Sequence, residues 1–430
     1  ICPAFLCQVI KRRAPCNTAA DNNNPGSGFH FLTFPCRTRT DQQLHLRVNG
    51  VLCFPKKMEQ SSRIYENHVK RLQLCCAVVS SLPCRYRGGF MTDGASKQQR
   101  SGRKARLARR AAPPQVNPAP PGQTGGCYQP LSEHDLRAIY ATALRLLSVL
   151  GMGEVPQRLR DDLKKAGAID LDGGRIGLPN ALVEDSIAQA ARRFVLHGRD
   201  PDRSVEVGGS QVYFGTGGAA VKTLDLETGL YRPSTLADLH DFTRLQDTLD
   251  NVAWFTRCCI ATDIPDSFDL DINTAYALMK NTTKPVATAF TLAEHVDPVV
   301  KLFDIAAGGT GQFSRRPFAK AHISPVISPM RFGEDAVDVV YKCVEHNIPM
   351  SCITAAQAGA TAPATLAGFL AQSLAETLAS LVMVNVIKPG FPMVFSNWPL
   401  VIDLRTGAFS GGSGETAVLN AASAQLSNWL

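Results

Sequence analysis

The alternation of strand and helix is plainest between Pro349 and Trp398, which read PMSCITAAQAGATAPATLAGFLAQSLAETLASLVMVNVIKPGFPMVFSNW. A short apolar run begins near Pro349, a long helical pattern begins near Leu366, and a second short apolar run begins near Pro392. Short apolar runs between proline, glycine and small residues are typical of buried strands, whereas the longer run has the length of a helix. The stretch therefore predicts one strand-helix-strand unit.

The same unit recurs through the second half of the chain. Strands that alternate with helices imply a parallel sheet covered by helices. An open doubly wound sheet and an eight-fold barrel share this signature, so the pattern alone leaves both architectures open. The predicted strands begin near Val252, Val286, Phe318, Pro349 and Pro392, and the helical patterns begin near Phe268, Val296, Glu334, Leu366 and Glu415.

The longest apolar stretch, Leu366 to Ile387, contains Gln372, Glu376 and Asn385. Each of these side chains would be expensive in lipid, so the stretch predicts a buried helix and no membrane span. A secretory signal is not expected either, because basic residues 11–13 stand where a cleavage region should be. We therefore expect a cytoplasmic protein.

A smaller region precedes the repeated units, between residues 131 and 250. Leucines recur at helical spacing up to Gly151, which is placed to end a helix. Apolar residues then alternate between Val205 and Leu226, which predicts two or three hairpin strands. A further helix with a capping box is expected to open at Thr235. We expect this region to be a helical and β-hairpin extension in front of a partial α/β barrel at residues 251–430.

Two different compositions are joined near residue 90. Eight of the 13 cysteines precede residue 91, and residues 1–90 show no sustained helical or strand period. Met91 then opens a polar run rich in arginine, alanine and proline. We expect residues 1–90 to be non-native upstream sequence without a fold, and residues 91–130 to be a disordered basic and proline-rich tail.

The formal net charge of +8 is local, because seven Lys and Arg residues lie between Lys97 and Arg110. The rest of the chain is nearly neutral. No aromatic side chains are interleaved with this basic block to stack on bases. We therefore predict a solvated tail and no nucleic-acid partner.

Three familiar kinds of site are not predicted. The run from Gly215 to Gly218 follows a strand, but it leads into a second strand and not into the helix N-terminus that a phosphate cradle needs. Its glycines instead allow a tight turn or close approach by another chain or a ligand. No Cys-x-x-Cys or His-Glu-x-x-His motif offers a metal site, and no Gly-x-Ser-x-Gly elbow offers a serine nucleophile. We expect this chain to bind no metal and no cofactor of its own.

Polar side chains gather at the carboxyl ends of the predicted strands, which form the catalytic face of a barrel. Strand ends are also polar simply because the chain turns there, so the set carries more weight than any single member. The set consists of Thr262, Asp263, Thr291, Glu294, His322, Ser324, Thr354, Gln357, Asn397 and Trp398.

Several motifs in a fixed order resemble the trimethylamine methyltransferase family, and the resemblance runs from about Leu131 to Leu430. It implies a TIM-type (β/α)8 barrel. The predicted units would then leave roughly three more after Leu430, so we expect a C-terminally truncated barrel. The motifs are Tyr213-Phe-Gly-Thr-Gly-Gly218, Asp225-Leu-Glu-Thr-Gly229, Arg232-Pro-Ser-Thr-Leu-Ala-Asp-Leu239, Gln357-Ala-Gly-Ala-Thr-Ala-Pro363 and Lys388-Pro-Gly390.

The resemblance implies an enzyme that binds a small methylated amine and presents one methyl group to the Co(I) of a separate corrinoid protein. The corrinoid, a cobalamin, would be carried by that partner. No pyrrolysine is written in the chain, so we expect the branch that is similar to glycine betaine methyltransferases. Three alternatives stay open: a pyrrolysine-dependent trimethylamine methyltransferase cut at an amber codon after Leu430, a non-catalytic amine-binding barrel, and a lyase-type barrel with Lys320 as its Schiff-base lysine. The sequence allows a homo-oligomer without specifying one.

Displacement at a quaternary nitrogen expels a neutral tertiary amine, so the reaction needs no proton donor. The protein must orient a cation and exclude water, and an aromatic cage is the expected device. Phe290, Phe395 and Trp398 are its candidates. A carboxylate on the substrate would pair with an arginine, for which Arg331 and Arg405 are candidates. The remaining predicted substrate-binding residues come from the strand ends: His322, Gln357 and Asn397.

Overall fold

The computed structural model describes residue 117 and residues 120–430. The expectations for residues 1–90 and for residues 91–116 fall outside this part of the chain. Residues 123–124, which were expected to belong to the tail, form a short strand, β1, that pairs with β6. Helices and short hairpins come first in the described part, and units of one strand and one helix follow.

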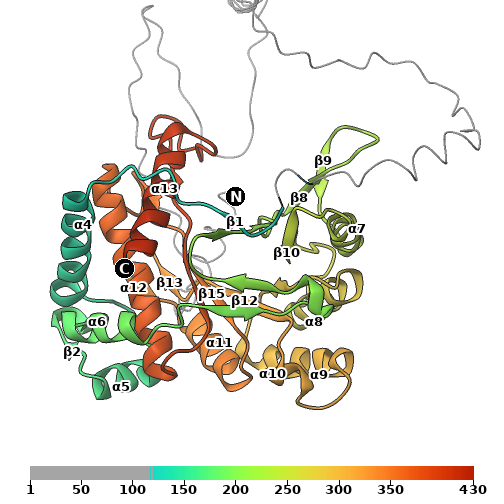
Figure 1. Cartoon of the computed structure of the whole chain (residues 1–430), viewed down its shortest axis with the longest axis horizontal. Coiled ribbons are helices and arrows are strands. Elements are labelled where there is room, and N and C mark those ends of the chain that lie inside the picture. The colour runs from blue at the N-terminus through green and yellow to red at the C-terminus, as the bar shows by residue number, and fades with distance from the viewer. Residues whose placement is uncertain (1–116, 118–119) are drawn as a thin grey trace, which may run out of the picture. The chain divides into compact units, whose positions relative to one another are not determined.

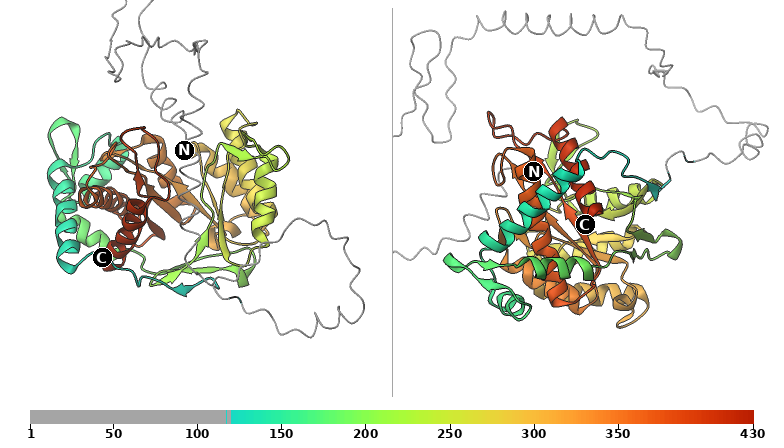
Figure 2. Two further views of the ribbon diagram at one scale, coloured as in Figure 1. Left: turned by 90° about the horizontal axis from the view of Figure 1, so that it is seen from above. Right: turned by 60° about the vertical axis from the view of Figure 1, so that its left-hand side comes forward.

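Six parallel strands form the central sheet, which curls and so has a concave and a convex face (Figures 1 and 2). Neighbouring strands follow one another in chain order without the reversal that marks an open doubly wound sheet. This order is the one found in the wall of a barrel. In chain order the strands are β7 (Phe214–Gly215), β10 (Val252–Thr256), β11 (Val286–Thr288), β12 (Ala319–Ile323), β15 (Met350–Thr354) and β17 (Met393–Asn397).

The sheet confirms the predicted α/β architecture with parallel strands, and the strands β10 to β17 lie where the sequence predicts them. The sixth strand corrects the prediction, because Phe214–Gly215 pairs in parallel with β10 and not in a hairpin. Gly215 allows this pairing, since a Cβ atom there would lie 2.1 Å from the Trp254 ring. Among the described strands no pair joins β17 to β7. Closure into a full (β/α)8 barrel therefore stays a prediction.

Helices that follow the strands pack against the convex face of the sheet. Side chains cap some of their first turns: Ser413 accepts from Thr416 N, and Thr235 forms the predicted capping box with Asp238. The helices are α7 (Leu236–Asp247), α8 (Ser267–Asn281), α9 (Val296–Ala307), α11 (Glu334–Glu345), α12 (Leu366–Ile387) and α13 (Gly414–Trp429), with the short α10 (Gln312–Arg315) after α9.

The long apolar helix α12 is buried on nearly all sides, between strands β15 and β17 and an N-terminal helical layer. By length and composition it could cross a membrane, but 83% of its most apolar window is buried inside the protein. Its Glu376 accepts hydrogen bonds from Ser328 Oγ (2.5 Å) and Met330 N (3.0 Å). Burial raises the pKa of this carboxyl group. The helix is thus the buried core helix that the sequence predicts.

The N-terminal helical layer lies against α12 (Figure 1). A capping box between Ser132 and Asp135 starts it, and Gly151, at φ 66°, ends its first helical run. A Cβ atom at Gly151 would lie 2.3 Å from the Ile176 carbonyl oxygen, which explains the glycine. The layer consists of α4 (Glu133–Arg145), a π-helical turn (Leu146–Leu150), α5 (Gln157–Lys165), β2 (Ile169–Asp170), β3 (Ile176–Gly177) and α6 (Asn180–Gln189).

Short two-stranded sheets surround the curled sheet. Apart from the antiparallel pair β2–β3 of the helical layer, four pairs are antiparallel and one, β16 with β18, is parallel. The hairpin β8–β9 belongs to the loop that follows β7. The pairs are β1 (Gln123–Thr124) with β6 (Gln211–Val212), β4 (Phe194–Leu196) with β5 (Val205–Val207), β8 (Lys222–Leu224) with β9 (Tyr231–Pro233), β13 (Val326–Ile327) with β14 (Arg331–Phe332), and β16 (Gln357–Ala358) with β18 (Leu400–Val401).

Side chains on the curled sheet alternate between its two faces. On β12, Ala321 and Ile323 join the core under the helices. Lys320 and His322 therefore point to the concave face. His322 stands in register with Ser351 of β15, so the two side chains share that face. The concave face thus carries an amine, an imidazole and a hydroxyl group close together.

Candidate functional site

A cavity of about 280 Å³ lies on the concave face of the sheet. Its wall comes from four strands, β10, β12, β15 and β17, and the hairpin β4–β5 covers part of it. The lining residues that carry polar or aromatic groups are Gln211, Tyr213, Trp254, Lys320, His322, Ser351 and Ser396. None of the described residues that line the cavity is acidic.

Lys320 is the most deeply buried charged group of the cavity. Its Nζ donates to Ser351 Oγ at 2.6 Å and lies 4.4 Å from the centroid of the Trp254 ring. No carboxylate in the described part of the chain forms an ion pair with it, and burial lowers the pKa of its amine to about 7. Near neutral pH, then, a small change in surroundings decides whether this amine is charged.

His322 lies two residues further along β12. Burial, together with the positive charges of Lys320 and Arg257, lowers the pKa of its imidazole to about 4. Its Nδ1 is buried and has no hydrogen-bond partner within the described residues. The same holds for Oγ1 of Thr256, which shares the concave face through its register with Ala287. The cavity therefore holds a neutral imidazole with an open hydrogen-bonding position.

The loop after β11 is held by a buried carboxylate at the carboxyl end of the sheet. Asp271 accepts from Thr291 N at 2.6 Å, from Thr291 Oγ1 at 3.0 Å, and bonds His295 Nδ1 at 2.8 Å. Arg257 lies nearby, and burial lowers the pKa of its guanidinium group. Thr291, one of the strand-end polar residues, therefore fixes this loop.

Within residues 120–430, no cluster of three or more His, Cys, Asp or Glu side chains could hold a metal ion. The lining of the concave cavity can offer hydrogen-bond donors, one amine and aromatic surface. Such a lining suits a small polar ligand that carries negative charge.

Comparison with known proteins places this chain in a family. The family model described as trimethylamine methyltransferase matches residues 99–430. The chain belongs to the trimethylamine methyltransferase family. The chain is 28% identical over 299 residues to the trimethylamine methyltransferase MttB of Desulfitobacterium hafniense (strain DSM 10664 / DCB-2), which covers 69% of this chain and 60% of that protein.

Two further relatives are a glycine betaine methyltransferase and an archaeal MttB. The glycine betaine methyltransferase of Desulfitobacterium hafniense (strain Y51) is 27% identical over 309 residues, which is 72% of this chain and 64% of the relative. The trimethylamine methyltransferase MttB of Methanosarcina barkeri (strain Fusaro / DSM 804) is 26% identical over 300 residues, 69% of this chain and 60% of the relative. This family member thus spans 60% to 64% of the length of these relatives.

The aromatic residues expected to form a cage lie elsewhere in this trimethylamine methyltransferase family member. Phe290 and Phe395 pack against the core cluster. Phe395 cannot face the cavity, because its neighbours Val394 and Ser396 line it and side chains alternate along the strand. Trp398 is 38% exposed beyond the end of β17. The aromatic rings at the cavity are Trp254 and Tyr213.

Two predicted polar residues hold the architecture together. Asn397 points to the convex side, where its Nδ2 donates to Ser373 Oγ of α12 (2.7 Å) and Ser423 Oγ of α13 (3.1 Å). The backbone N–H of Gln357 donates to Thr361 Oγ1 within the loop that precedes α12. Of the predicted polar strand-end residues, His322 lines the cavity.

The two arginines predicted to bind a carboxylate lie away from the cavity lining. Arg331 pairs with Glu154 at 2.8 Å and so ties β14 to the N-terminal layer. Arg405 is 90% exposed beside Asp403. The cation at the cavity is Lys320, the candidate Schiff-base lysine.

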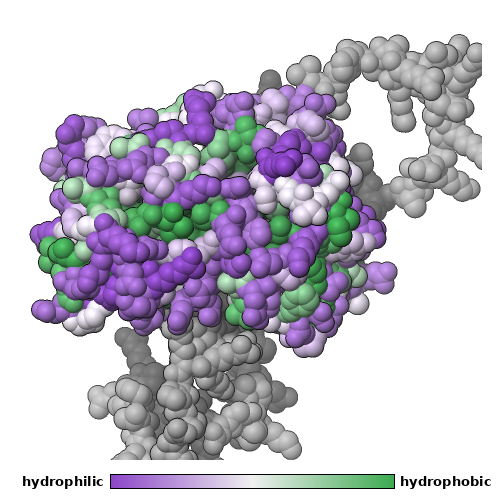
Figure 3. All heavy atoms as spheres, turned by 90° about the horizontal axis from the view of Figure 1, so that it is seen from below, coloured by the Kyte–Doolittle hydropathy of each residue, from purple (hydrophilic) through white to green (hydrophobic). Residues whose placement is uncertain are grey.

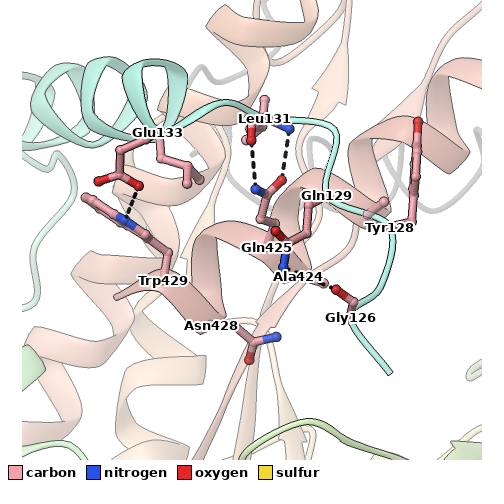
Figure 4. A pocket seen from close by; sticks show the side chains of 11 residues that line it. Gly126, Tyr128, Gln129, Leu131, Glu133, Ala424, Gln425, Asn428 and Trp429 are labelled. Atoms are coloured by element: carbon pink, nitrogen blue, oxygen red, sulfur yellow. Dashed lines mark hydrogen bonds between the residues drawn. The ribbon is translucent and has the colours of Figure 1, made fainter. Parts of the chain in front are cut away.

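A larger hollow, about 600 Å³, lies between the segment before α4 and helix α13 (Figure 4). Gln425 bonds both backbone groups of Leu131, accepting from N at 2.9 Å and donating to O at 2.8 Å. Trp429 Nε1 donates to Glu133 Oε2 at 3.2 Å. These bonds fasten the segment to α13, so we attribute a packing role to this hollow and the site to the concave cavity.

Proposed function

We propose that this chain forms the amine-binding part of a methyltransferase that takes a methyl group from a quaternary amine such as glycine betaine and gives it to the Co(I) of a cognate corrinoid protein. Its membership in the trimethylamine methyltransferase family supports methyl transfer from an amine, and one relative is named a glycine betaine methyltransferase. The observation that carries the proposal is the concave cavity of the curled sheet, a pocket with aromatic surface and a few convergent polar groups.

In the proposed reaction one carbon–nitrogen bond breaks and its electron pair stays on nitrogen. The methyl carbon forms its new bond with an electron pair supplied by the cobalt of the partner. The leaving group is a neutral tertiary amine, so no proton donor is required. His322, neutral near pH 7 because its pKa is lowered to about 4, fits a site that positions a substrate without protonating it.

The test mixes the purified chain with a reduced corrinoid protein and follows the visible absorbance of the corrinoid. Glycine betaine, proline betaine, carnitine and trimethylamine are supplied in turn. The proposal predicts methylation of the corrinoid with at least one betaine. Binding of a betaine without any transfer would instead support a non-catalytic amine-binding barrel. Faster transfer from trimethylamine than from every quaternary amine would instead support the alternative of a pyrrolysine-dependent trimethylamine methyltransferase.

One observation favours a second candidate function, a lyase-type reaction through Lys320. A buried lysine whose pKa is about 7 is partly neutral at that pH, and a neutral amine can attack a carbonyl carbon to form a Schiff base. Borohydride reduction in the presence of small aldehydes and keto acids tests this function. A mass increase on the peptide that contains Lys320, absent from the Lys320→Met variant, would support the lyase.

A further inference from the structure

The Lys320 amine is buried at the concave cavity and has no anionic partner among the described residues. Lys320 Nζ uses one of its three N–H donors on Ser351 Oγ, at 2.6 Å, and the Trp254 ring lies beside it at 4.4 Å. The remaining donors face a cavity whose described lining has no carboxylate. A buried charge without a counter-ion is costly, so a ligand that brings a carboxylate would offset that cost.

A second donor lies on the same strand and the same face. His322 Nδ1 is buried without a partner within the described residues, and it can donate to a ligand oxygen when it carries the ring proton. Lys320 and His322 are two positions apart, which is roughly 7 Å along a strand. Together they can bind two oxygen atoms of one small anion, or its oxygen and a bridging water.

Building on the proposed function, we propose that Lys320 and His322 bind the carboxylate of a zwitterionic substrate, so that the site selects betaines over amines without a carboxylate. The Trp254 ring holds the Lys320 amine in place by a cation–π contact. An opposite charge next to the amine favours its protonated form, so the bound carboxylate itself keeps Lys320 charged.

The same arrangement predicts that trimethylamine binds poorly. A methylammonium group without a carboxylate would add a second positive charge to the cavity beside Lys320, and like charges repel. A betaine brings both charges at once. His322 lies nearer the carboxyl ends of the strands than Lys320 does. A carboxylate held at this pair leaves the methylated nitrogen free to point toward that end, where barrel enzymes carry out their chemistry.

The experiment measures binding by isothermal titration to the 430-residue chain and to two variants. The ligands are glycine betaine, choline, which has the same trimethylammonium group without a carboxylate, and acetate, which has the carboxylate alone. Lys320→Met removes the amine at similar volume. Lys284→Met is the matched control, because Lys284 is equally buried but donates to the carbonyl oxygens of Gln246 and Leu249, away from the cavity.

We expect wild-type chain to bind glycine betaine at least about tenfold more tightly than choline, a difference of about 1.4 kcal/mol. Lys320→Met should lose that preference, while Lys284→Met should keep it. A preference that survives in Lys320→Met would overturn the inference, as would the absence of glycine betaine binding to wild-type chain.

A measurement on the wild-type chain covers the case in which Lys320→Met does not fold. Reductive methylation with formaldehyde and a borane reductant, followed by mass spectrometry, reports how accessible each lysine is. Glycine betaine and acetate should protect Lys320, and choline should not. Equal protection by choline and glycine betaine would contradict carboxylate binding. If the chain prefers glycine betaine to choline but transfers no methyl group to the corrinoid protein, the proposed function is refuted. The inference about carboxylate binding is then still supported.

Discussion

Lys320 and His322 show how far single residues can be interpreted from the sequence. Two polar residues at positions two apart on one strand must share a face. The sequence singles out His322 by its place at a strand end and Lys320 as a lysine inside a strand. Which face of the sheet is concave depends on how six strands curl together. No local sequence pattern encodes that curvature. For the same reason Phe395 looks like a cage residue in the sequence and faces the core in the structure.

His322 should make the stability of the protein sensitive to mild acid. Its pKa is about 4 in the folded chain and near 6.5 when exposed, so the unfolded state binds more protons between these values. The free energy of unfolding should therefore fall as the pH drops from 6.5 to 4, by up to about 3 kcal/mol. Lys320, whose pKa is about 7, changes the free energy of unfolding in a higher pH range.

Urea unfolding of wild-type chain and of His322→Leu at both pH values measures this effect. The variant should lose the part of the pH dependence that His322 contributes, whereas partly buried groups such as His197 and His240 keep theirs. His134→Leu, at a side chain 91% exposed, is the control and should behave as wild type. An unchanged pH dependence in His322→Leu would contradict the buried neutral imidazole.

At the scale of elements, the strands β10 to β17 and their helices follow from apolar runs bounded by proline and glycine. Strand β7 does not, because it has two residues and lies in a glycine-rich stretch that locally favours a turn. Its pairing with β10 depends on the fit of Gly215 against the Trp254 ring, a contact between residues 39 positions apart in the chain. Such a long-range fit leaves no periodic signal in the sequence.

Gly215→Ala should therefore destabilise the edge of the sheet. The added methyl group would lie 2.1 Å from the Trp254 ring, so the ring or the strand must shift. We expect a loss of about 1 to 3 kcal/mol in the free energy of unfolding. Gly217→Ala is the matched control, since no atom lies within 4 Å of its Cβ position. Thermal melting of both variants measures the difference, and equal stability would contradict the close approach.

Asn397 offers a second test, because the sequence and the structure assign it different tasks. Its amide links α12 to α13, so Asn397→Ala should cost about 1 to 3 kcal/mol of stability and leave the affinity for glycine betaine unchanged. Asn420→Ala is the control for removal of an asparagine amide, because the exposed Asn420 amide bonds only within α13. A variant that keeps its stability but loses betaine affinity would restore Asn397 to the substrate site.

At the scale of the whole molecule, the described sheet ends at β7 and β17, and neither has a further strand paired with it in residues 120–430. Figure 3 shows an apolar band across one face, between polar borders. Unpaired strand edges and apolar surface both favour association between copies. We therefore expect the 430-residue chain to self-associate. Light scattering over a concentration series measures it, and a monomer at every concentration would contradict this expectation.

The central claim is that the methylated amine binds in the concave cavity. A crystal structure of the chain with glycine betaine bound tests it most directly. We predict the ligand between the curled sheet and the hairpin β4–β5, with its carboxylate at Lys320 and His322 and its methyl groups toward the carboxyl ends of the strands. Glycine betaine in the hollow between Leu131 and α13, with the concave cavity free of ligand, would contradict the claim.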